Sequence, residues 1–420
     1  MSRFPKITET FILYEMLAIE RLGFDVALYP IWRARAAVIH PEALGWLERA
    51  NFRCSLSLVV LRANWQVLRQ QPRNYVDTLR ATFRGTWGSL RFFCGALAVF
   101  PKAVCFASEM KAGGIVHVHA HFASHPALVA FIIHRLVGIS YSFTAHGSDL
   151  HRDRRMLGQK IGEAAFTVTI SEYNRHVMAA ECAAEDRHKL QVIHCGVDTQ
   201  LFRPSSFGSA GARETSPLSI FCVGTLHEVK GQTHLIRACR LLSGHGIDVV
   251  LNFIGDGPDR QALRRQAVEA GMADRVVFHG EKTHAQVADL LRAADVVAAP
   301  SVPTRTGRRE GIPVVLMEAM STGIPVVASR LSGIPELVEH ERTGLLVPPR
   351  DAQALANAFR RLHADPSLRH RLGQAGRFKI MREFDLFTNS AALAELFEME
   401  DRATRGARAP AGPSAVESAS

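Results

Sequence analysis

The distribution of apolar residues along the chain predicts two halves built on the same plan. Short runs rich in Val and Ile alternate with longer segments whose apolar residues recur every three or four positions. This alternation is typical of βαβ units and parallel sheets. In the first half, the expected strands are Asp25–Tyr29, Gly114–Ala120, Ser140–Ala145, Phe166–Ser171 and Lys189–His194. In the second half, they are Leu218–Val223, Val249–Gly255, Val276–His279, Val296–Ala299, Pro325–Ala328 and Gly344–Val347. The pattern predicts an α/β protein with two doubly wound domains.

Breaks in this pattern set the expected domain boundaries. Residues 203–217 are rich in Ser, Gly and Pro without periodicity, so we expect them to link a first domain, 1–202, to a second, 218–384. An amphipathic helix is expected at 385–400. Residues 401–420 are mostly Ala, Gly, Pro, Ser and Arg, and this composition predicts a disordered tail.

Positive charge is concentrated in one part of the first half. The chain has 50 Lys and Arg against 40 Asp and Glu, a formal net charge of +10, and residues 31–91 alone contain ten Arg and three acidic residues. Within this stretch, apolar residues such as Leu58, Leu61 and Trp65 share one face of an expected helix, with arginines between them. Such a helix suits the interface of an anionic membrane. An ordinary helix with a solvated Arg face remains the alternative, whereas no nucleic-acid-binding module is recognisable.

The cysteines and the ends of the apolar runs predict a cytoplasmic protein. Seven cysteines are scattered without a CxxC pair, which is typical of free thiols in a reducing compartment. The first residues lack the apolar core of a signal peptide. The longest uncharged apolar run near the basic stretch, Phe92–Pro101, is about half the roughly 20 residues that a membrane span needs. Attachment to the inner face of the plasma membrane would then be peripheral.

The segment from Glu310 to Glu318 carries the strongest chemical signal. Pro313 suits the first turn of a helix, which puts Glu310 on the preceding loop and Glu318 inside the helix. Gly311 allows a ligand to approach the backbone, and the free amides around it favour an anion. Carboxylates accept hydrogen bonds from hydroxyl groups. These residues predict a phosphate ligand that carries sugar or ribose hydroxyls, although two incidental acids on a surface helix would give the same spacing.

Two further segments follow expected strands. Lys230 stands before a helix, in a loop that begins at Gly224, where its ammonium group can neutralise a diphosphate. His146 and Asp149 follow a strand of the first half, and ligands of open α/β sheets bind outside this end of the strands. A histidine there can donate to a phosphate or a sugar hydroxyl, while a turn-capping His-Gly pair is the alternative.

Alternating histidines raise the question of a metal. His117, His119 and His121 share one face of an expected strand, and H-x-H spacing can bind zinc. No Cys or acidic residue stands nearby in the sequence, so no metal is expected. The strand is instead expected to deliver His121 to the mouth of a cleft.

Taken together, these segments resemble a family 4 glycosyltransferase of GT-B fold. The resemblance runs from Phe4 to about Phe397 and rests on VHAHFA, TAHGSD, IHCGVDTQLF, VGTLHEVKGQ, IGDGP and REGIPVVLMEAMSTGIPVVASRLSGIPELVEHERTGLLV. The opening FPKITETFI is most similar to exopolysaccharide enzymes of the colanic-acid type. The resemblance implies two Rossmann-like domains that face each other across a cleft, with the final helix crossing back to the first domain.

The resemblance also implies roles for individual residues. Glu310, Lys230 and His146 would form the catalytic set: Glu310 on the donor sugar, Lys230 on the diphosphate and His146 across the cleft. The donor would be bound by Gly224, Thr225, Lys230, Gly311, Ile312, Pro313, Val314 and Glu318, with Glu318 on the ribose. The acceptor side would hold Thr10, His121 and Asp149. Members of the family are retaining enzymes that generally need neither a metal nor a cofactor.

The implied activity is hexosyl transfer from a UDP- or GDP-linked sugar to a saccharide acceptor, which we expect to be lipid-linked, in exopolysaccharide or cell-envelope glycan synthesis. Two features depart from the family pattern. Thr225 stands where the family usually has an Arg that assists the lysine, so a sugar-nucleotide-binding member without transferase activity is the alternative. The strand that normally precedes FPKITETFI is reduced to residues 1–3 at most, which predicts an incomplete first strand.

Overall fold

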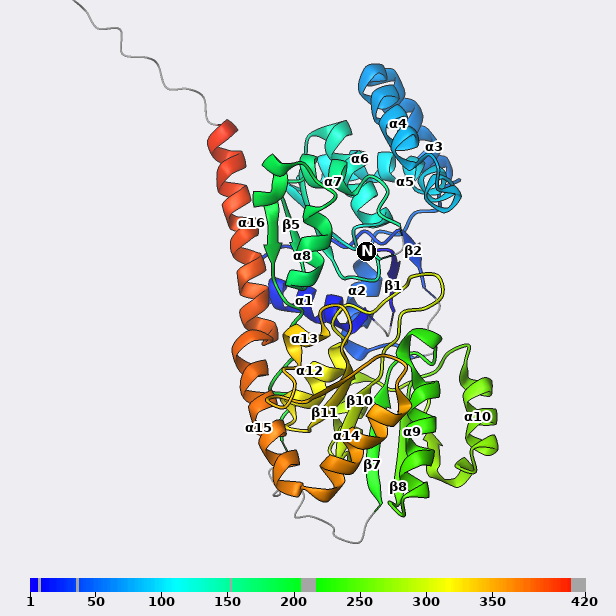
Figure 1. The fold of residues 1–420 in the computed structure, drawn as a ribbon. Coiled ribbons are helices and arrows are strands. Elements are labelled where there is room, and N and C mark those ends of the chain that lie inside the picture. The colour runs from blue at the N-terminus through cyan, green and yellow to red at the C-terminus, as the bar shows by residue number, and fades with distance from the viewer. Residues whose placement is uncertain (7–8, 35–37, 152, 205–216, 409–420) are drawn as a thin grey trace, which may run out of the picture.

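The computed structural model describes residues 1–6, 9–34, 38–151, 153–204 and 217–408. Two α/β units stack on each other, and a long C-terminal helix runs along both (Figure 1). Each unit has its own parallel sheet, with strand order β3-β4-β5-β6 in the first and β12-β11-β10-β7-β8-β9 in the second. This arrangement agrees with the two α/β domains that the apolar pattern predicts, and the second sheet has the doubly wound strand order.

The first sheet has four strands in the described residues, whereas the sequence predicts five. Its strands are β3 (His117–His121), β4 (Ser140–Ala145), β5 (Phe166–Thr169) and β6 (Leu190–Val192). The prediction of a strand at Asp25–Tyr29 is wrong, because this segment forms no strand and buries Leu28 in a small apolar cluster with Ile12 and Trp46. A separate two-residue pair, β1 (Arg3–Phe4) and β2 (Trp32–Arg33), stands beside the cluster.

The first unit contains the helices α1 (Thr10–Arg21), α2 (Leu44–Arg49), α3 (Leu58–Gln70), α4 (Pro72–Thr86), α5 (Leu90–Ala112), α6 (His125–Val137), α7 (Leu157–Glu163) and α8 (Glu172–Ala179). Helix α6 packs on β3 and β4, while α3 and α4 pack on other helices. The side chains of Ser57 and Ser89 accept hydrogen bonds from backbone amides in the first turns of α3 and α5, as N-caps do. Helices α5 and α6 supply most of the core beneath β3 and β4.

Helix α5 is longer than its uncharged apolar run, since it continues through Pro101 and Lys102 to Ala112. Among the described residues it is the one helix long and apolar enough to cross a membrane, judged by length and composition alone. More than half of its apolar window is buried within the first unit. Core helices of other proteins pass the same test, so α5 is a weak candidate for a membrane span.

The second unit follows the predicted strands to within one residue at each end. They are β7 (Leu218–Val223), β8 (Val249–Ile254), β9 (Val276–Phe278), β10 (Val296–Ala299), β11 (Val326–Ser329) and β12 (Leu345–Val347). The helices are α9 (Gln232–Gly244), α10 (Arg260–Glu269), α11 (His284–Leu291), α12 (Val314–Ser321), α13 (Ile334–Leu337), α14 (Ala352–Ala364) and α15 (Pro366–Glu383). The chain leaves β7 for β8 on one side and returns to β10 on the other, so the strand order reverses between β7 and β10. A crevice opens at such a reversal, where ligands bind in open α/β sheets.

Helix α16 (Leu386–Arg408) returns to the first unit and packs against α1. Leu393 and Ala394 are buried there with Ile19, Phe166 and Val168. The helix continues beyond the expected end at residue 400, so the prediction of disorder is wrong for residues 401–408. Arg405 pairs with Asp401 one helical turn earlier, and pairs at this spacing support a helix. Residues 409–420 and most of the expected linker, 205–216, lie outside the described residues.

Candidate active site

A cleft of about 1230 Å³ separates the two units. Its walls are formed by segments that follow β7, β8 and β10 in the second unit, and by the start of α1 and the segment after β4 in the first. The carboxyl ends of the strands in both sheets therefore face the same space. This is the place where the sequence predicts a ligand.

Glu310 and Lys230 meet on the wall of the second unit. Lys230 ends a 3₁₀ turn after β7, and Glu310 lies on the loop between β10 and α12. The Lys230 Nζ atom is 2.5 Å from Glu310 Oε1, and the Ser301 hydroxyl donates to Glu310 Oε2 at 2.6 Å. Both oxygens of the carboxylate are thus engaged, and the charge of Lys230 is neutralised within the protein.

Glycines let the strand ends and the two units approach closely. A Cβ atom on Gly255 would lie 2.2 Å from the carbonyl oxygen of Gly224, so these two loops touch backbone to backbone. A Cβ atom on Gly311 would lie 2.6 Å from the carbonyl oxygen of His146, and one on Gly147 would lie 2.9 Å from Gly311 Cα. The turn after β4 in the first unit therefore touches the loop before α12 in the second. No side chain fits between them.

Glu318 is buried inside α12 and binds a residue that sequence reasoning missed. The Glu318 Oε1 atom is 2.9 Å from His284 Nε2, at the start of α11. Tyr14 of α1 stacks on the His284 ring, with centroids 4.7 Å apart. The carboxylate of the second unit is thus connected to the first unit through one imidazole. No motif in the sequence marks His284 or Tyr14, because their proximity arises only from the packing of α1 on α11.

His146 lines the cleft, but its ring nitrogens are directed into the first unit. Its Nε2 atom lies 3.3 Å from His121 Nδ1, and its Nδ1 atom lies 3.8 Å from Cys195 Sγ, which also lines the cleft. Burial lowers the pKa of His146 to about 3, so the imidazole is neutral at physiological pH.

Asp149 and His121 lie behind the cleft wall and hold His146 from the protein side. Asp149 accepts hydrogen bonds from the backbone amides of His146 and Ala123, at 3.0 and 2.6 Å. Burial raises the pKa of Asp149. Neither Asp149 nor His121 belongs to the cleft lining, whereas Thr10 does. Of these three residues expected on the acceptor side, only Thr10 is thus in a position to contact a ligand in the cleft directly.

The predicted donor-side residues are brought together on one wall. The cleft lining contains Gly224, Thr225, Lys230, Gly311, Ile312, Pro313, Val314 and Glu318. Pro313 is the N-cap of α12 rather than its first helical residue. Arg308 and Arg309 also line the cleft and bring positive charge to the wall that carries Thr225, while Arg305 is exposed outside it.

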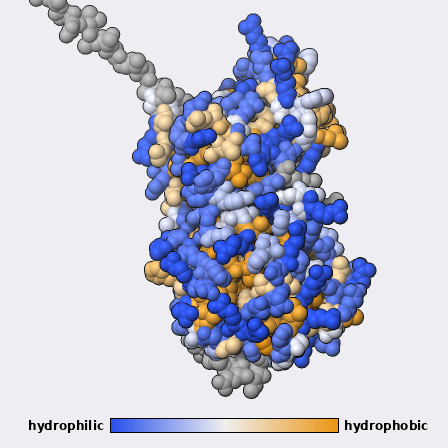
Figure 2. Space-filling model, viewed as in Figure 1, coloured by the Kyte–Doolittle hydropathy of each residue, from blue (hydrophilic) through white to orange (hydrophobic). Residues whose placement is uncertain are grey.

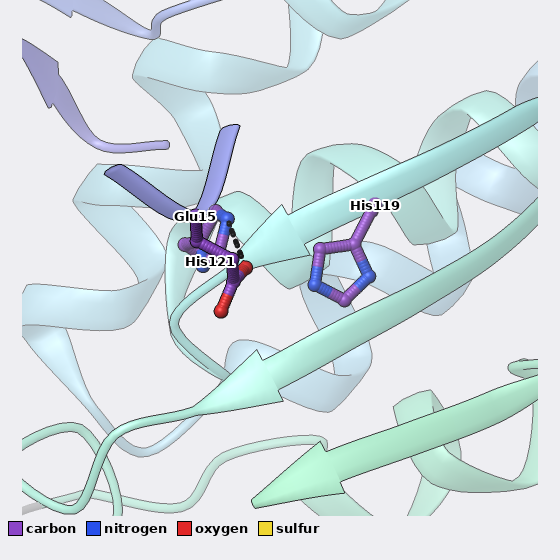
Figure 3. Close-up of side chains that lie close together, drawn as sticks. All are labelled: Glu15, His119 and His121. Atoms are coloured by element: carbon purple, nitrogen blue, oxygen red, sulfur yellow. Dashed lines mark ion pairs between the residues drawn. The ribbon is translucent and has the colours of Figure 1, made fainter. Parts of the chain in front are cut away.

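A cluster of two histidines and one carboxylate offers three potential metal ligands. Glu15 of α1 lies beside His119 and His121 (Figure 3), and the three ligand atoms are within 4.8 Å of one another. The sequence alone does not place this carboxylate near the histidines. Both nitrogens of His119 are already hydrogen-bonded, to Ser142 and Thr144 of β4. The cluster therefore fits a hydrogen-bonded ladder between the strands, and the expectation of no metal stays a prediction.

The glycine contact between the units can be tested with Gly311→Ala. The added methyl group would meet the backbone oxygen of His146, which cannot rotate away, so we expect the apparent free energy of unfolding to fall by about 1–3 kcal/mol. Denaturant unfolding followed by circular dichroism measures this change. Gly244→Ala in α9 is the control, because nothing lies within 4 Å of its added Cβ. Equal stability of Gly311→Ala and the wild type would contradict the contact.

Comparisons with known proteins agree with this geometry. The sequence matches the family model described as Glycosyl transferases group 1 over residues 205–379. The colanic acid biosynthesis glycosyltransferase WcaL of Escherichia coli (strain K12) is 32% identical over 393 residues, which cover 87% of this chain and 90% of that protein. The amylovoran biosynthesis glycosyltransferase AmsK of Erwinia amylovora is 34% identical over 412 residues, covering 94% of this chain and 97% of that protein. The structure of a glycosyltransferase from Rickettsia africae ESF-5 superimposes with a TM-score of 0.68 at 13% identity, over 96% of this chain and 98% of that one, and indicates the fold alone.

These relatives are named as transferases, and they do not favour the alternative of a binding protein without transferase activity. The two parallel sheets and the similar solved structure confirm the expected GT-B fold. The chain belongs to the Glycosyl transferases group 1 family and is a glycosyltransferase.

Proposed function

We propose that the protein transfers a hexosyl residue, with retention of configuration, from a UDP- or GDP-linked sugar to a saccharide acceptor in exopolysaccharide or cell-envelope glycan synthesis. The observation that carries the proposal is the Glu310–Lys230 pair, which lies at the strand-order reversal and faces His146 across the cleft. The names of the relatives, for colanic acid and amylovoran biosynthesis, support a polysaccharide product.

The donor diphosphate would compete with Glu310 for Lys230. A diphosphate beside Lys230 and the start of α12 would meet a full positive charge and the positive end of a helix. Lys230 would then turn from Glu310 to the phosphate, which frees the carboxylate to accept hydrogen bonds from sugar hydroxyls. Glu318 would bind the ribose in the same way. Arg308 and Arg309 supply further cations to the same cleft lining, whereas the family usually has an arginine at the position of Thr225.

The transfer would proceed on one face of the donor sugar. The bond from the anomeric carbon to the diphosphate oxygen breaks, a bond from the same carbon to the acceptor oxygen forms, and the acceptor proton passes to the diphosphate. Lys230 and the start of α12 stabilise the charge on the leaving diphosphate. The Cys195 thiol in the cleft is not used as a nucleophile, because burial raises its pKa and keeps it protonated. The proposed step uses neither a metal nor a cofactor.

Glu310→Ala and Lys230→Ala test the donor site. Each variant is expected to lower turnover by at least about 100-fold, because each removes a charged group from the reacting centre. Transfer is measured with UDP- and GDP-linked hexoses and an oligosaccharide-diphosphate-lipid acceptor, and donor binding is measured by calorimetry. Glu269→Ala and Lys111→Ala, both exposed and outside the cleft lining, are the matched controls. Wild-type turnover in both site variants would reject the proposal, and donor binding without transfer by the wild type would favour the binding-only alternative.

We also propose that the enzyme works peripherally at the cytoplasmic face of the plasma membrane, on a lipid-linked acceptor. The support lies in α3 and the start of α5, where large apolar side chains are unusually exposed. They are Leu56, Leu58, Val59, Leu61, Trp65, Trp87, Leu90 and Leu97, with Trp65 63% and Leu90 80% exposed. Figure 2 shows apolar surface beside hydrophilic surface at this end of the molecule. We call these eight residues the α3–α5 patch.

The charges around the α3–α5 patch favour an anionic bilayer over other occupants. Six exposed arginines accompany it: Arg62, Arg69, Arg73, Arg80, Arg84 and Arg91. Asp77 is the one acidic residue between residues 55 and 108, all of which are described. An ordinary helix with a solvated Arg face would bury its apolar side, whereas Leu58, Leu61 and Trp65 face solvent. Exposed rings and basic side chains on one surface are typical of helices that lie in a lipid interface.

The double variant Leu61→Ser/Trp65→Ser tests this surface. We expect its binding to vesicles of phosphatidylglycerol and phosphatidylcholine to weaken by at least about tenfold, since two buried apolar contacts with lipid are lost. Co-sedimentation at rising salt concentration should also show weaker binding of the wild type, because salt screens its arginines. Phe378→Ser, an equally exposed apolar residue in the second unit, is the control. Equal wild-type binding to vesicles of phosphatidylcholine alone would reject the role of lipid charge.

A further inference from the structure

A chain of polar side chains connects α1 with the cleft. Glu15 Oε1 lies 3.5 Å from His121 Nε2, a contact marked by the dashed line in Figure 3. His121 Nδ1 lies 3.3 Å from His146 Nε2, and His146 Nδ1 lies 3.8 Å from Cys195 Sγ at the cleft wall. We call Glu15, His121 and His146 the relay. Each imidazole in it uses one nitrogen toward α1 and the other toward the cleft.

The hydrogen bonds along the relay must all run in the same donor-to-acceptor direction. A neutral imidazole has one N–H donor and one acceptor nitrogen. Burial holds the pKa values of His121 and His146 well below their usual range, so neither ring takes up a second proton near neutral pH. A donor at one end of the chain therefore fixes the direction of each hydrogen bond that follows.

Two proton arrangements satisfy this condition. If Glu15 is protonated, its hydroxyl donates to His121 Nε2, His121 Nδ1–H donates to His146 Nε2, and His146 carries its proton on Nδ1. If Glu15 is ionised, it accepts from His121 Nε2–H, His121 Nδ1 accepts from His146 Nε2–H, and His146 Nδ1 becomes an acceptor. The nitrogen beside Cys195 is thus a donor in one arrangement and an acceptor in the other.

We infer that Glu15 is a positioning residue that acts through His121 to decide which ring nitrogen of His146 carries the proton. Glu15 itself does not reach the cleft, because it is absent from the cleft lining and its side chain is only 19% exposed. With Glu15 protonated, His146 carries its proton on Nδ1, the nitrogen directed at Cys195 in the cleft lining, and this N–H can donate to a sugar hydroxyl or a phosphate that takes the place of the thiol. The consequence for transfer rests on the proposed function of His146, whereas the relay rests only on the contacts.

The surroundings make Glu15 the member of the relay that titrates near neutral pH. Burial raises its pKa to about 8. The titratable groups that face the relay are His119 on β3, the Cys195 thiol and the amino group of Met1. Burial lowers the pKa of His119 and raises that of Cys195, so both stay neutral, and it lowers the pKa of the Met1 amino group to about 6. His119 is bonded to β4 hydroxyls and does not carry a proton between Glu15 and His146.

Nuclear magnetic resonance of ¹⁵N-histidine-labelled protein tests the relay without any substrate. The His146 signals, assigned with His146→Gln, are expected to report a proton on Nδ1 at pH 6.5 and on Nε2 at pH 9.5, with a midpoint near pH 8. In Glu15→Gln, which cannot ionise, the tautomer should not change with pH. Glu20→Gln is the control, because Glu20 lies on the same helix and pairs with Arg49. A wild-type tautomer that is constant over this pH range overturns the inference.

Turnover separates the relay from the proposed function. Above pH 8 the wild type should lose the N–H donor of His146, so we expect its turnover to fall by about tenfold, a fall that Glu15→Gln should not show. If the tautomer switches but turnover is unchanged, the relay stands and the proposed role of His146 in transfer fails. If turnover falls equally in the wild type and Glu15→Gln, the loss has another source and the functional part of the inference is overturned.

Discussion

The site depends on a contact made by two backbones. Gly311 approaches the carbonyl oxygen of His146 so closely that a single methyl group would not fit, and Gly147 makes the reciprocal approach. Each glycine directly follows a residue of the proposed active site: Glu310 precedes Gly311, and His146 precedes Gly147. The contact thus sets the distance across the cleft between the residues proposed to bind sugar and acceptor. Larger side chains here would separate the two walls, however well each sheet folded by itself. Helix α16 adds a second connection on the far side, where it packs on α1.

The carboxylates of Glu310 and Glu318 in the cleft are paired inside the protein. Glu310 is held by Lys230 and Ser301, and Glu318 is held by His284, which is itself stacked under Tyr14 of the other unit. Partly buried carboxylates without partners would cost several kcal/mol each. A ligand that brings a diphosphate and hydroxyl groups can exchange with these partners one for one, so binding replaces hydrogen bonds rather than adding isolated charges. Arg308 and Arg309 belong to the same cleft lining as the neutral Thr225, so the cleft carries further cations besides Lys230.

The sequence predicts what is local and misses what depends on packing. Short apolar runs, such as those of β7 and β10, mark buried parallel strands, and loops after them contain Lys230 and Glu310. Asp25–Tyr29 has a similar composition but packs as an extended segment against α1, so composition alone misassigns it. No sequence motif marks Glu15 or His284. Glu15 meets His121, and His284 meets Tyr14, only when α1 packs against β3 and α11. The direction of the His146 ring is likewise set by His121 and Cys195, which no spacing rule connects to it.

The placement of charge differs between the two units. The second unit directs Lys230 and the start of α12 into the cleft, where the proposed donor diphosphate would bind. The first unit directs its arginines outward around the α3–α5 patch, on helices that take no part in the cleft lining. Because α5 is also a core helix beneath β3 and β4, a bilayer that binds the patch would be coupled rigidly to the wall that carries His146. An acceptor anchored in that bilayer would then reach the cleft from the first unit, while a soluble donor enters beside the second.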